Sequence, residues 1–342
     1  MAYTSSPLVS VVIANWNGCA LLRKCLGGVE KQTYDPLEVI VVDNGSDDGS
    51  REMIEKEWQG RVKLIVNEEN LGYARAINQG IRCSQSRYIA TLNNDAVPNP
   101  NWIAALVEAA EHDPKIGMVA SKIVTFDDPD IIDGTGLSIY ADGSSRARGR
   151  LEADHGQYDE LHEALLPSGC AALYRRSMLD EIGLHDEAFF AYCEDTDLGL
   201  RARLAGWQCA FTSRAVVRHR YSASSGEYSE TKAFLVERNR LWVAAKNFPL
   251  GRLLLSPLYT LVRYAVHAWA AIRGSGSAGR FAQQTSRGRL LLVLLRAQLA
   301  GLRGLPQALR ARRKIRVKVP PQEIRRWFRE FGMSAWELAF KD

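Results

Sequence analysis

Four short apolar runs alternate with helix-like stretches in the first hundred residues. The runs cover residues 8–14, 38–43, 62–66 and 88–92, and the segments between them are long enough to form helical crossovers. Val- and Ile-rich runs with such crossovers predict an α/β fold, in which a mostly parallel sheet is covered by helices on both faces. These sheets bind ligands at the carboxyl ends of their strands, so the polar residues after each run are the first functional candidates.

Asn15 and Asn17 follow the first run, and Asp43 ends the second. The Asp, Asn, Ser and Gly residues of 43–50 are also typical of a turn and a helix N-cap. That reading leaves Asp43 unexplained, because it directly ends an apolar run and should face the ligand crevice. The first run is not followed by G-x-G-x-x-G, which argues against a dehydrogenase.

Residues 67–80 contain a glycine followed by a predicted helix. Gly72 permits close approach of backbone, and Arg75 and Asn78 are three residues apart, which places them on one helix face. Arg75 could meet a phosphate or a base there. A single helical arginine is, however, more often solvated.

The fourth run leads directly into Asn93, Asn94 and Asp95. A carboxylate in this position can hold Mg²⁺ or Mn²⁺, which prefer oxygen ligands and often bind through one or two carboxylates plus substrate phosphates. A nucleotide diphosphate is therefore the ligand that this segment favours. Asn and Asp also end strands in ordinary turns, so the motif depends on its context.

Residues 131–168 are rich in Gly, Asp, Arg and Ser and predict an irregular or hairpin-bearing insertion over the sheet edge. Further on, Glu194 and Asp195 open a predicted helix that ends at Gly206. Acids at a helix start complement the dipole by about 0.3–1 kcal/mol per charge, which explains one or two of them. The aromatic residues before Glu194 predict an apolar setting, which would raise the pKa of a carboxyl group and suit it to act as a base.

His219 follows another apolar run and lies between Arg218 and Arg220. A single histidine is more often structural than a metal ligand. The neighbouring arginines should disfavour its protonated form, and neutral imidazole is the form that binds metals.

In this order the motifs resemble those of the family 2 glycosyltransferases, in particular bacterial rhamnosyltransferase-like members that build surface polysaccharides. The likeness covers roughly residues 8–249. It is carried by residues 11–17, 42–46, 70–80, 92–95, 194–195 and 219. The resemblance implies a GT-A fold and inverting transfer of a sugar from a nucleotide diphosphate, with L-rhamnose from dTDP-rhamnose as the first choice.

The resemblance also implies roles for individual residues. Asp195 would be the catalytic base, while Asp95 and His219 would hold Mn²⁺ or Mg²⁺. The first acid of the family's DxD motif is Asn93 here, which lowers the negative charge and should weaken metal binding without donor. The nucleotide-sugar site would comprise Asn15, Asn17, Asp43, Gly72, Arg75, Asn78, Asn93 and Asn94. The acceptor site would comprise Gly169, Cys170, Tyr192 and Glu194.

Two alternatives stay open on the sequence. The donor could be a UDP-hexose or a UDP-N-acetylhexosamine, since sugar choice depends on pocket shape. The chain could also be a non-catalytic nucleotide-binding scaffold at a membrane, which the presence of both Asp95 and Asp195 disfavours.

The composition of the chain also indicates the cellular compartment and the partners to expect. The chain is 46% hydrophobic and 24% charged, as in globular proteins. Its six cysteines form no CxxC pair, which argues against a zinc cage or a disulfide framework. The first ten residues lack an export signal, so we expect a cytoplasmic protein, peripheral on the inner face of the cell membrane.

The charge is divided unevenly along the chain. Residues 250–342 contain 18 Lys+Arg and 4 Asp+Glu, whereas residues 1–249 contain 26 and 35. We therefore divide the chain into a catalytic domain, 1–249, and a basic amphipathic helical region, 250–342. The excess of basic residues predicts an anionic partner. Nucleic acid is disfavoured because no binding motif accompanies the charge.

The basic region predicts amphipathic helices. Residues 253–272 approach the length of a membrane span, but Pro257, Arg263 and His267 favour an interfacial helix. After a glycine- and serine-rich linker at 274–279, arginines recur every seven residues beside a leucine-rich face, at 289, 296, 303 and 310. Gly301, Gly304 and Pro306 are expected to interrupt any single helix there. The leucine face could bind a membrane, pack on the catalytic domain, or join subunits of a homo-oligomer.

Overall fold

The computed structural model describes residues 6–221, 229–273 and 287–340, and the predicted linker at 274–279 lies outside these ranges. The N-terminal repeat forms the parallel strands that the sequence predicts, and they neighbour one another in the order β3-β2-β1-β4. The strands are β1 (Val9–Asn15), β2 (Leu37–Asn44), β3 (Lys63–Asn67) and β4 (Tyr88–Leu92). The crossovers are α1 (Cys19–Val29), α2 (Ser50–Glu57) and α3 (Tyr73–Cys83).

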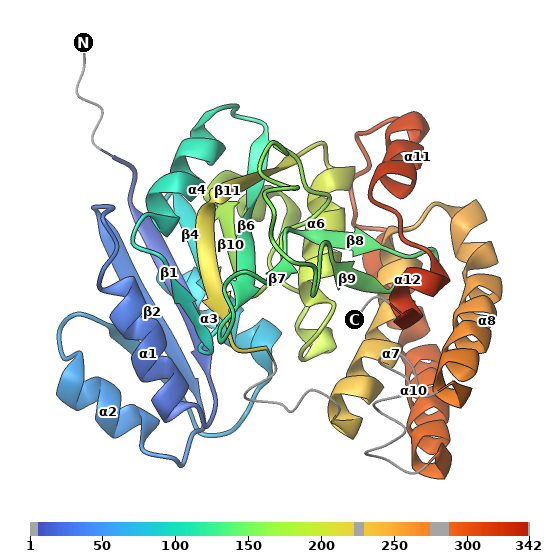
Figure 1. Ribbon diagram of the computed structural model, residues 1–342, viewed down its shortest axis with the longest axis horizontal. Coiled ribbons are helices and arrows are strands. Elements are labelled where there is room, and N and C mark those ends of the chain that lie inside the picture. The colour runs from blue at the N-terminus through green and yellow to red at the C-terminus, as the bar shows by residue number, and fades with distance from the viewer. Residues whose placement is uncertain (1–5, 222–228, 274–286, 341–342) are drawn as a thin grey trace.

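The sheet continues past β4 as a mixed sheet (Figure 1). Its further strands are β10 (Ala171–Arg175), β6 (Ile116–Thr125), β11 (Gln208–His219), β5 (Ala96–Pro98) and β7 (Ile132–Gly134). β10 is antiparallel to both β4 and β6, while β11 is parallel to β6. The α/β class predicted from the sequence is confirmed, and the parallel part is concentrated in the N-terminal half.

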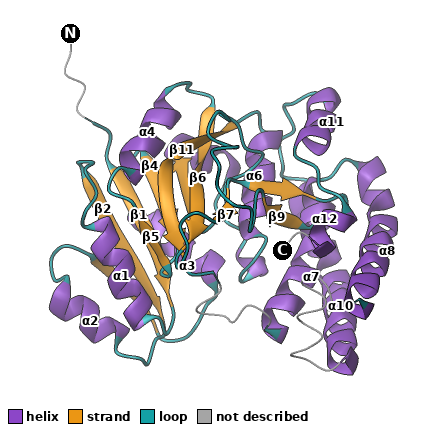
Figure 2. Cartoon of the chain, in the orientation of Figure 1, coloured by secondary structure: helices purple, strands orange, loops and turns teal. Residues whose placement is uncertain are grey.

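Helices cover both faces of the sheet (Figure 2). Because successive side chains of a strand point to opposite faces, Val11 belongs to a core cluster with residues of α1, α2 and α4 (Trp102–Glu111). Val12 belongs to another cluster with residues of α3, α5 (Arg176–Ile182) and α6 (Glu194–Leu204). This double burial explains why the strand sequences are almost continuously apolar. The predicted insertion contains a hairpin, β8 (Leu137–Ile139) with β9 (Ser145–Ala147).

The C-terminal part is helical. It contains α7 (Glu230–Asn247), α8 (Leu250–Ile272), α10 (Arg287–Arg312), α11 (Pro321–Glu330) and α12 (Ala335–Phe340). None of the helices in the described ranges is long and apolar enough to cross a membrane. Ile324 and Trp327 of α11 share a core cluster with Phe189 and Val243, so the basic region packs on the first 249 residues.

The expected break in α10 is wrong, because the helix runs through Gly301, Gly304 and Pro306. A methyl group at Gly301 would overlap Leu241, and one at Gly304 would overlap Trp242. The indole nitrogen Nε1 of Trp242 donates to the Gly301 carbonyl at 2.9 Å. The glycines therefore allow close packing of α10 on α7, and tertiary contact overrides their low helix propensity.

Helix α8 also accommodates the residues that argued against a membrane span. Pro257 cannot donate to the carbonyl of Leu253, and the Ser256 hydroxyl donates to that carbonyl at 2.8 Å instead. Arg263 is buried, and it pairs with Asp142 beside the hairpin and with Glu237 of α7, each at 2.7 Å. This ion network joins the basic region to residues 1–249.

Candidate active site

Polar side chains at the carboxyl ends of three neighbouring strands form one hydrogen-bonded row. Asn94 Nδ2 donates to Asn15 Oδ1 at 2.8 Å, and Asn15 Nδ2 donates to Asp43 Oδ2 at 3.1 Å. All three side chains are buried. They meet because β1 pairs with β2 on one side and with β4 on the other. The sequence therefore correctly places these residues at one edge of the sheet.

Asp43 is held as a carboxylate at this edge. Burial raises its pKa, but hydrogen bonds from Ser46, Arg51 and Asn15 outweigh burial and lower the pKa below its ordinary value. The Arg51 Nε lies 3.0 Å from Asp43 Oδ1, a contact that the sequence analysis missed. A carboxylate has about four acceptor positions. Oδ2 therefore has acceptor capacity left, but the side chain is fully buried, so a ligand could use it only after neighbouring groups move aside.

Asn17 and Gly72 lie in turns beside this row. Asn17 has a positive φ of 48° and accepts from the backbone nitrogen of Asp47 at 2.9 Å. Gly72 has a φ of 87°, and a side chain there would overlap Phe190. The close approach that Gly72 permits is thus to the segment preceding Glu194.

The structure contradicts the prediction that Asn78 binds the nucleotide. Its Nδ2 donates to the His185 carbonyl and to Glu187, each at 2.9 Å, and its Oδ1 accepts from the His185 nitrogen at 3.1 Å. Both ends of the buried amide are engaged within the protein, so we remove Asn78 from the nucleotide set. Arg75 is half exposed, and its Nε lies 3.8 Å from Glu187 Oε2. Because of this exposure, the guanidinium group can still contact a ligand.

Asp95 and His219 come together because Ala96 of β5 pairs with His219 at the end of β11. Asp95 Oδ1 is 3.3 Å from His219 Nε2. The other ring nitrogen, Nδ1, lies 2.6 Å from Asp133 Oδ2, and Asp133 also pairs with Arg150 at 2.7 Å. Asp133 lies in the insertion, and the sequence analysis did not identify it.

The expectation about the arginines beside His219 is wrong. Neighbours on a strand point to opposite faces, and Arg220 pairs with Asp127 instead. Burial lowers the pKa of His219, but Cys170, Asp133 and Asp95 together raise it well above the ordinary value. The ring therefore lies in an electronegative setting.

The pair Asp95 and His219 fits a divalent cation. Asp95 Oδ1 is buried and accepts no hydrogen bond from any described residue. Its separation from Nε2 resembles the roughly 3 Å between adjacent ligands of a cation bound at about 2.1 Å. Asp133 can fix the ring through the far nitrogen, as carboxylates often do for metal-bound histidines. Within the described ranges no three His, Cys, Asp or Glu side chains form a metal-ligand set.

Asp195 and Glu194 begin α6. Asp195 Oδ2 accepts from the Gly169 nitrogen at 2.9 Å, and Oδ1 accepts from the Thr196 nitrogen at 2.6 Å. Burial raises the pKa of Asp195, although these hydrogen bonds oppose the shift. Glu194 is buried, and burial and Asp195 raise its pKa well above the ordinary value. Its Oε2 has no hydrogen-bond partner among the described residues.

The segment before Glu194 has an unusual backbone. Phe190, Tyr192 and Cys193 have φ angles of 66°, 67° and 65°, which cost of order 1–3 kcal/mol each for residues with a side chain. Asn239 of α7 is fully buried, and its Nδ2 lies 3.0, 2.8 and 2.7 Å from the carbonyl oxygens of residues 189, 191 and 192, which share its two N–H donors. Asn239 thus holds the strained segment, and the sequence analysis missed it.

Gly169 and Cys170 lie between the two groups of candidate residues. Gly169 contacts Asp195, and the Asn93 nitrogen donates to the Cys170 carbonyl at 2.8 Å. The hydroxyl of Tyr73 donates to the Gly169 carbonyl at 2.8 Å. One short segment therefore connects the predicted base to the predicted metal and donor residues.

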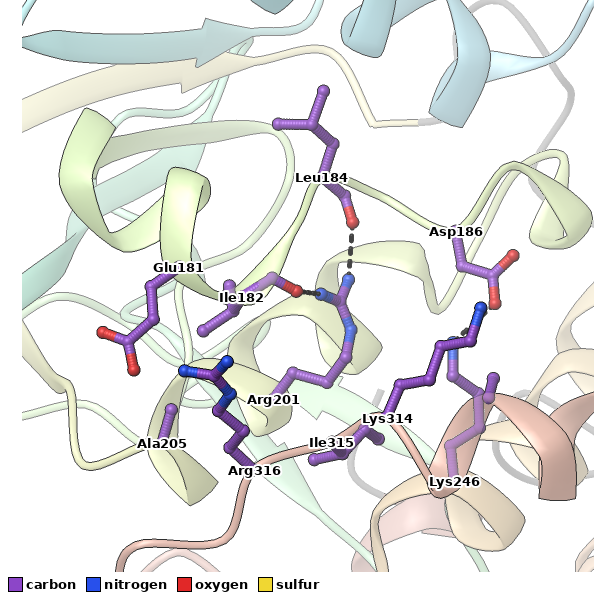
Figure 3. A pocket seen from close by; sticks show the side chains of 11 residues that line it. Glu181, Ile182, Leu184, Asp186, Arg201, Ala205, Lys246, Lys314, Ile315 and Arg316 are labelled. Atoms are coloured by element: carbon purple, nitrogen blue, oxygen red, sulfur yellow. Dashed lines mark hydrogen bonds and ion pairs between the residues drawn. The ribbon is translucent and has the colours of Figure 1, made fainter.

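A separate cavity lies between α5, α6 and the end of α10 (Figure 3). Its volume is about 190 Å³, whereas ligand pockets usually measure roughly 300–1,000 Å³. Arg201 on its wall donates to the carbonyls of Ile182 and Leu184 at 2.8 and 2.7 Å. None of the predicted site residues lines this cavity, so we place the candidate site at the strand ends.

Residues 10–183, just over half of the chain, match the sequence model described as Glycosyl transferase family 2. The chain belongs to glycosyl transferase family 2. Among its relatives is the N-acetylglucosaminyl-diphospho-decaprenol L-rhamnosyltransferase of Mycobacterium tuberculosis, which is 27% identical over 271 residues. That alignment covers 69% of this chain and 86% of the relative.

Solved structures of glycosyltransferases share the fold of this family 2 chain. A mannosyltransferase from Pyrobaculum calidifontis, solved with GDP-mannose and Mn²⁺, has a TM-score of 0.56 and 18% identity, covering 91% of this chain and 86% of the neighbour. GalNAc-T7, solved with UDP, GalNAc and Mn²⁺, has a TM-score of 0.58 and 20% identity, covering 70% of this chain and 48% of the neighbour. At these identities the likeness supports the fold alone, and it confirms the predicted GT-A architecture.

Proposed function

We propose that this family 2 protein is an inverting, metal-dependent glycosyltransferase that moves a sugar from a nucleotide diphosphate to a hydroxyl group. The proposed donor is dTDP-L-rhamnose, and the proposed acceptor is a glycan or a polyprenyl-linked sugar of a cell-surface polysaccharide. The mycobacterial relative, an N-acetylglucosaminyl-diphospho-decaprenol L-rhamnosyltransferase, supports the choice of rhamnose as the sugar and of a polyprenyl-linked acceptor. We also propose that the reaction takes place at the cytoplasmic face of the membrane.

The arrangement around Gly169 and Cys170 carries this proposal. Asp195 is anchored to the Gly169 nitrogen, while Asn93, two residues before Asp95, is anchored to the Cys170 carbonyl. The proposed base, Asp195, and the proposed diphosphate site at Asp95 therefore lie on either side of the segment formed by Gly169 and Cys170. Inverting transfer requires such a division, because the acceptor oxygen attacks the anomeric carbon from the face opposite the diphosphate.

Asp195 would accept the proton of the acceptor hydroxyl as the oxygen electron pair forms the new bond to the anomeric carbon. The bond from that carbon to the diphosphate breaks at the same time, and the configuration inverts. General-base catalysis is worth about 10²- to 10⁴-fold in rate. A divalent cation bound at Asp95 and His219 would supply Lewis-acid stabilisation of the departing diphosphate.

Donor binding and transfer can be tested separately. We expect dTDP-rhamnose with Mn²⁺ or Mg²⁺ to raise the melting temperature of both the wild type and Asp195→Asn, because a ligand that binds only the folded state stabilises it. Transfer should fall at least 100-fold in the variant. Asp180→Asn, an exposed change on α5, is the matched control and should retain transfer.

Several outcomes would change the proposal. Unchanged transfer by Asp195→Asn would overturn the assignment of the base. Stabilisation by UDP-sugars, and not by dTDP-sugars, would replace the rhamnose donor by a hexose or N-acetylhexosamine donor. Absence of stabilisation and of donor hydrolysis with every nucleotide class would favour the non-catalytic scaffold.

A further inference from the structure

The outward sides of α8 and α10 form a large apolar surface. Fifteen of the 24 exposed large hydrophobic side chains among the described residues lie on these two helices. On α8, Leu254, Leu261 and Ile272 are 80%, 65% and 77% exposed. Their spacing places them on one stripe of the helix. Soluble monomers rarely expose apolar patches beyond a few hundred Å², so a concentration of this kind indicates a partner.

The stripe on α10 has the same character. Leu295, Leu299 and Leu302 are 53%, 56% and 59% exposed, whereas Ala297 on the opposite side is fully buried. A hydrogen bond of 2.7 Å from Gln298 of α10 to the Tyr264 hydroxyl of α8 joins the two helices at one end of the molecule (Figure 1). We call their solvent-facing sides the α8–α10 face. It comprises Leu254, Leu258, Leu261, Ile272, Leu291, Leu295, Leu299 and Leu302.

Arginines flank the apolar part of this face. Arg289, Arg296, Arg303 and Arg310 recur every seven residues on α10, and all four are exposed. A spacing of seven residues keeps them on one edge of the helix, beside the leucine stripe. The sequence contains no Asp or Glu between Glu237 and Glu323, so neither helix carries an acid of its own, although Arg289 lies 4.0 Å from Glu230 of α7.

This charge pattern distinguishes a lipid surface from a second copy of the chain. A symmetric dimer through the α8–α10 face would bring the same patch of both copies together. The arginine rows would approach one another with no acid on either helix to pair with them. A bilayer with anionic headgroups satisfies both the apolar stripe and the arginines. Trp269 and Trp336, whose ring centroids are 5.2 Å apart, add side chains typical of the membrane interface.

We propose that the α8–α10 face docks on an anionic phospholipid bilayer, with the leucines at the boundary of headgroups and acyl chains and the arginines against the phosphates. This inference deepens the proposed function, on which it rests for the lipid-linked acceptor that docking would bring within reach. Docking itself requires neither donor nor acceptor. The two proposals can therefore fail independently.

Co-sedimentation of the full chain with vesicles tests the proposal. We expect binding to phosphatidylcholine vesicles that contain phosphatidylglycerol, and much weaker binding to phosphatidylcholine alone. The variant with Leu254, Leu261, Leu295 and Leu302 all changed to Gln should bind at least tenfold less. Changing Arg289, Arg296, Arg303 and Arg310 to Gln should lower binding to anionic vesicles by about fivefold per arginine and reduce its salt dependence.

The matched control changes exposed leucines on the catalytic part, Leu8→Gln with Leu151→Gln and Leu161→Gln, and should bind vesicles as the wild type does. All these variants should unfold cooperatively at a melting temperature close to that of the wild type without any ligand, which shows that they are folded. Equal vesicle binding by the wild type and the four-leucine variant would overturn the proposal. A dimer in light scattering that the four-leucine variant converts to monomer would also overturn it, in favour of a second copy.

Discussion

The buried carboxyl group of Glu194 makes the stability of the fold depend on pH. Its side chain is 5% exposed, and burial together with Asp195 raises its pKa well above the ordinary value of 4.5. A group with a raised pKa contributes its full stabilisation below the ordinary pKa and loses it as the pH rises through the folded-state pKa. The contribution of Glu194 to stability therefore falls as the pH rises above 4.5, because the unfolded chain releases the proton before the folded protein does.

We expect Glu194→Gln to raise the melting temperature at about pH 8 and to have a smaller effect near pH 4, because the amide resembles the protonated carboxyl group. Thermal melting of both proteins across this range measures the difference. Glu187→Gln, a half-buried change at η1 (Glu187–Phe189), serves as the control. A difference in melting temperature that does not change with pH would show that ionisation of Glu194 does not cost stability.

The residues that the sequence predicted and those that it missed differ in how they reach the site. Asn15, Asp43 and Asp95 lie at the ends of apolar runs or within three residues of them, so the rule that α/β sheets bind ligands at their strand ends was enough to propose them. Asn239 reaches the strained segment from a helix about 50 residues later, and Asp133 reaches His219 across 86 residues. Such contacts depend on how the elements pack, which local sequence patterns do not contain.

At the scale of elements, α7 links the catalytic segment to the basic helices. Asn239 faces the carbonyls of residues 189–192, while Leu241 and Trp242 contact the glycines of α10. Local propensity predicted a break in α10 at those glycines, whereas the packing partner makes them necessary. The same helix therefore positions the site and carries the α8–α10 face.

We expect Asn239→Ala to lower the turnover of the proposed transfer at least tenfold, because the carbonyls of residues 191 and 192 lose Asn239 as their donor. The free energy of unfolding should fall by about 1–3 kcal/mol, the cost of leaving buried acceptors unpaired. Gly301→Ala is the matched control. It should destabilise the α7–α10 contact by about 1–3 kcal/mol through overpacking, without touching the segment before Glu194.

Turnover and denaturant unfolding of both variants separate positioning from stability. If Gly301→Ala lowers turnover as much as Asn239→Ala at the same loss of stability, the effect is a general one and Asn239 is not a positioning residue. If the donor still raises the melting temperature of Asn239→Ala, the substitution lowers turnover at a step after donor binding.

At the scale of the whole molecule, the net charge of the chain changes from acidic to basic near residue 250, but the hydrophobic core is continuous across this position. Ile324 and Trp327 of α11 lie in the same cluster as Phe189, Leu200 and Val243. Asp142, Glu237, Arg240 and Arg263 form a buried ion network that spans the hairpin, α7 and α8. Charge composition predicts a boundary near residue 250, but it carries no information on the packing that the two parts share.

A chain of residues 1–249 should therefore fold poorly. It would expose the sides of α6 and α7 that α10 and α11 cover, and it would leave Asp142 and Glu237 without Arg263, which is strongly destabilising for buried charges. We expect a melting temperature well below that of the full chain, or aggregation on expression, and the measurement is thermal unfolding of both proteins. The full chain with Arg263→Met tests the ion network alone and should show part of the loss. Equal melting temperatures for the full and shortened chains would instead establish two independent domains, with the catalytic one complete by residue 249.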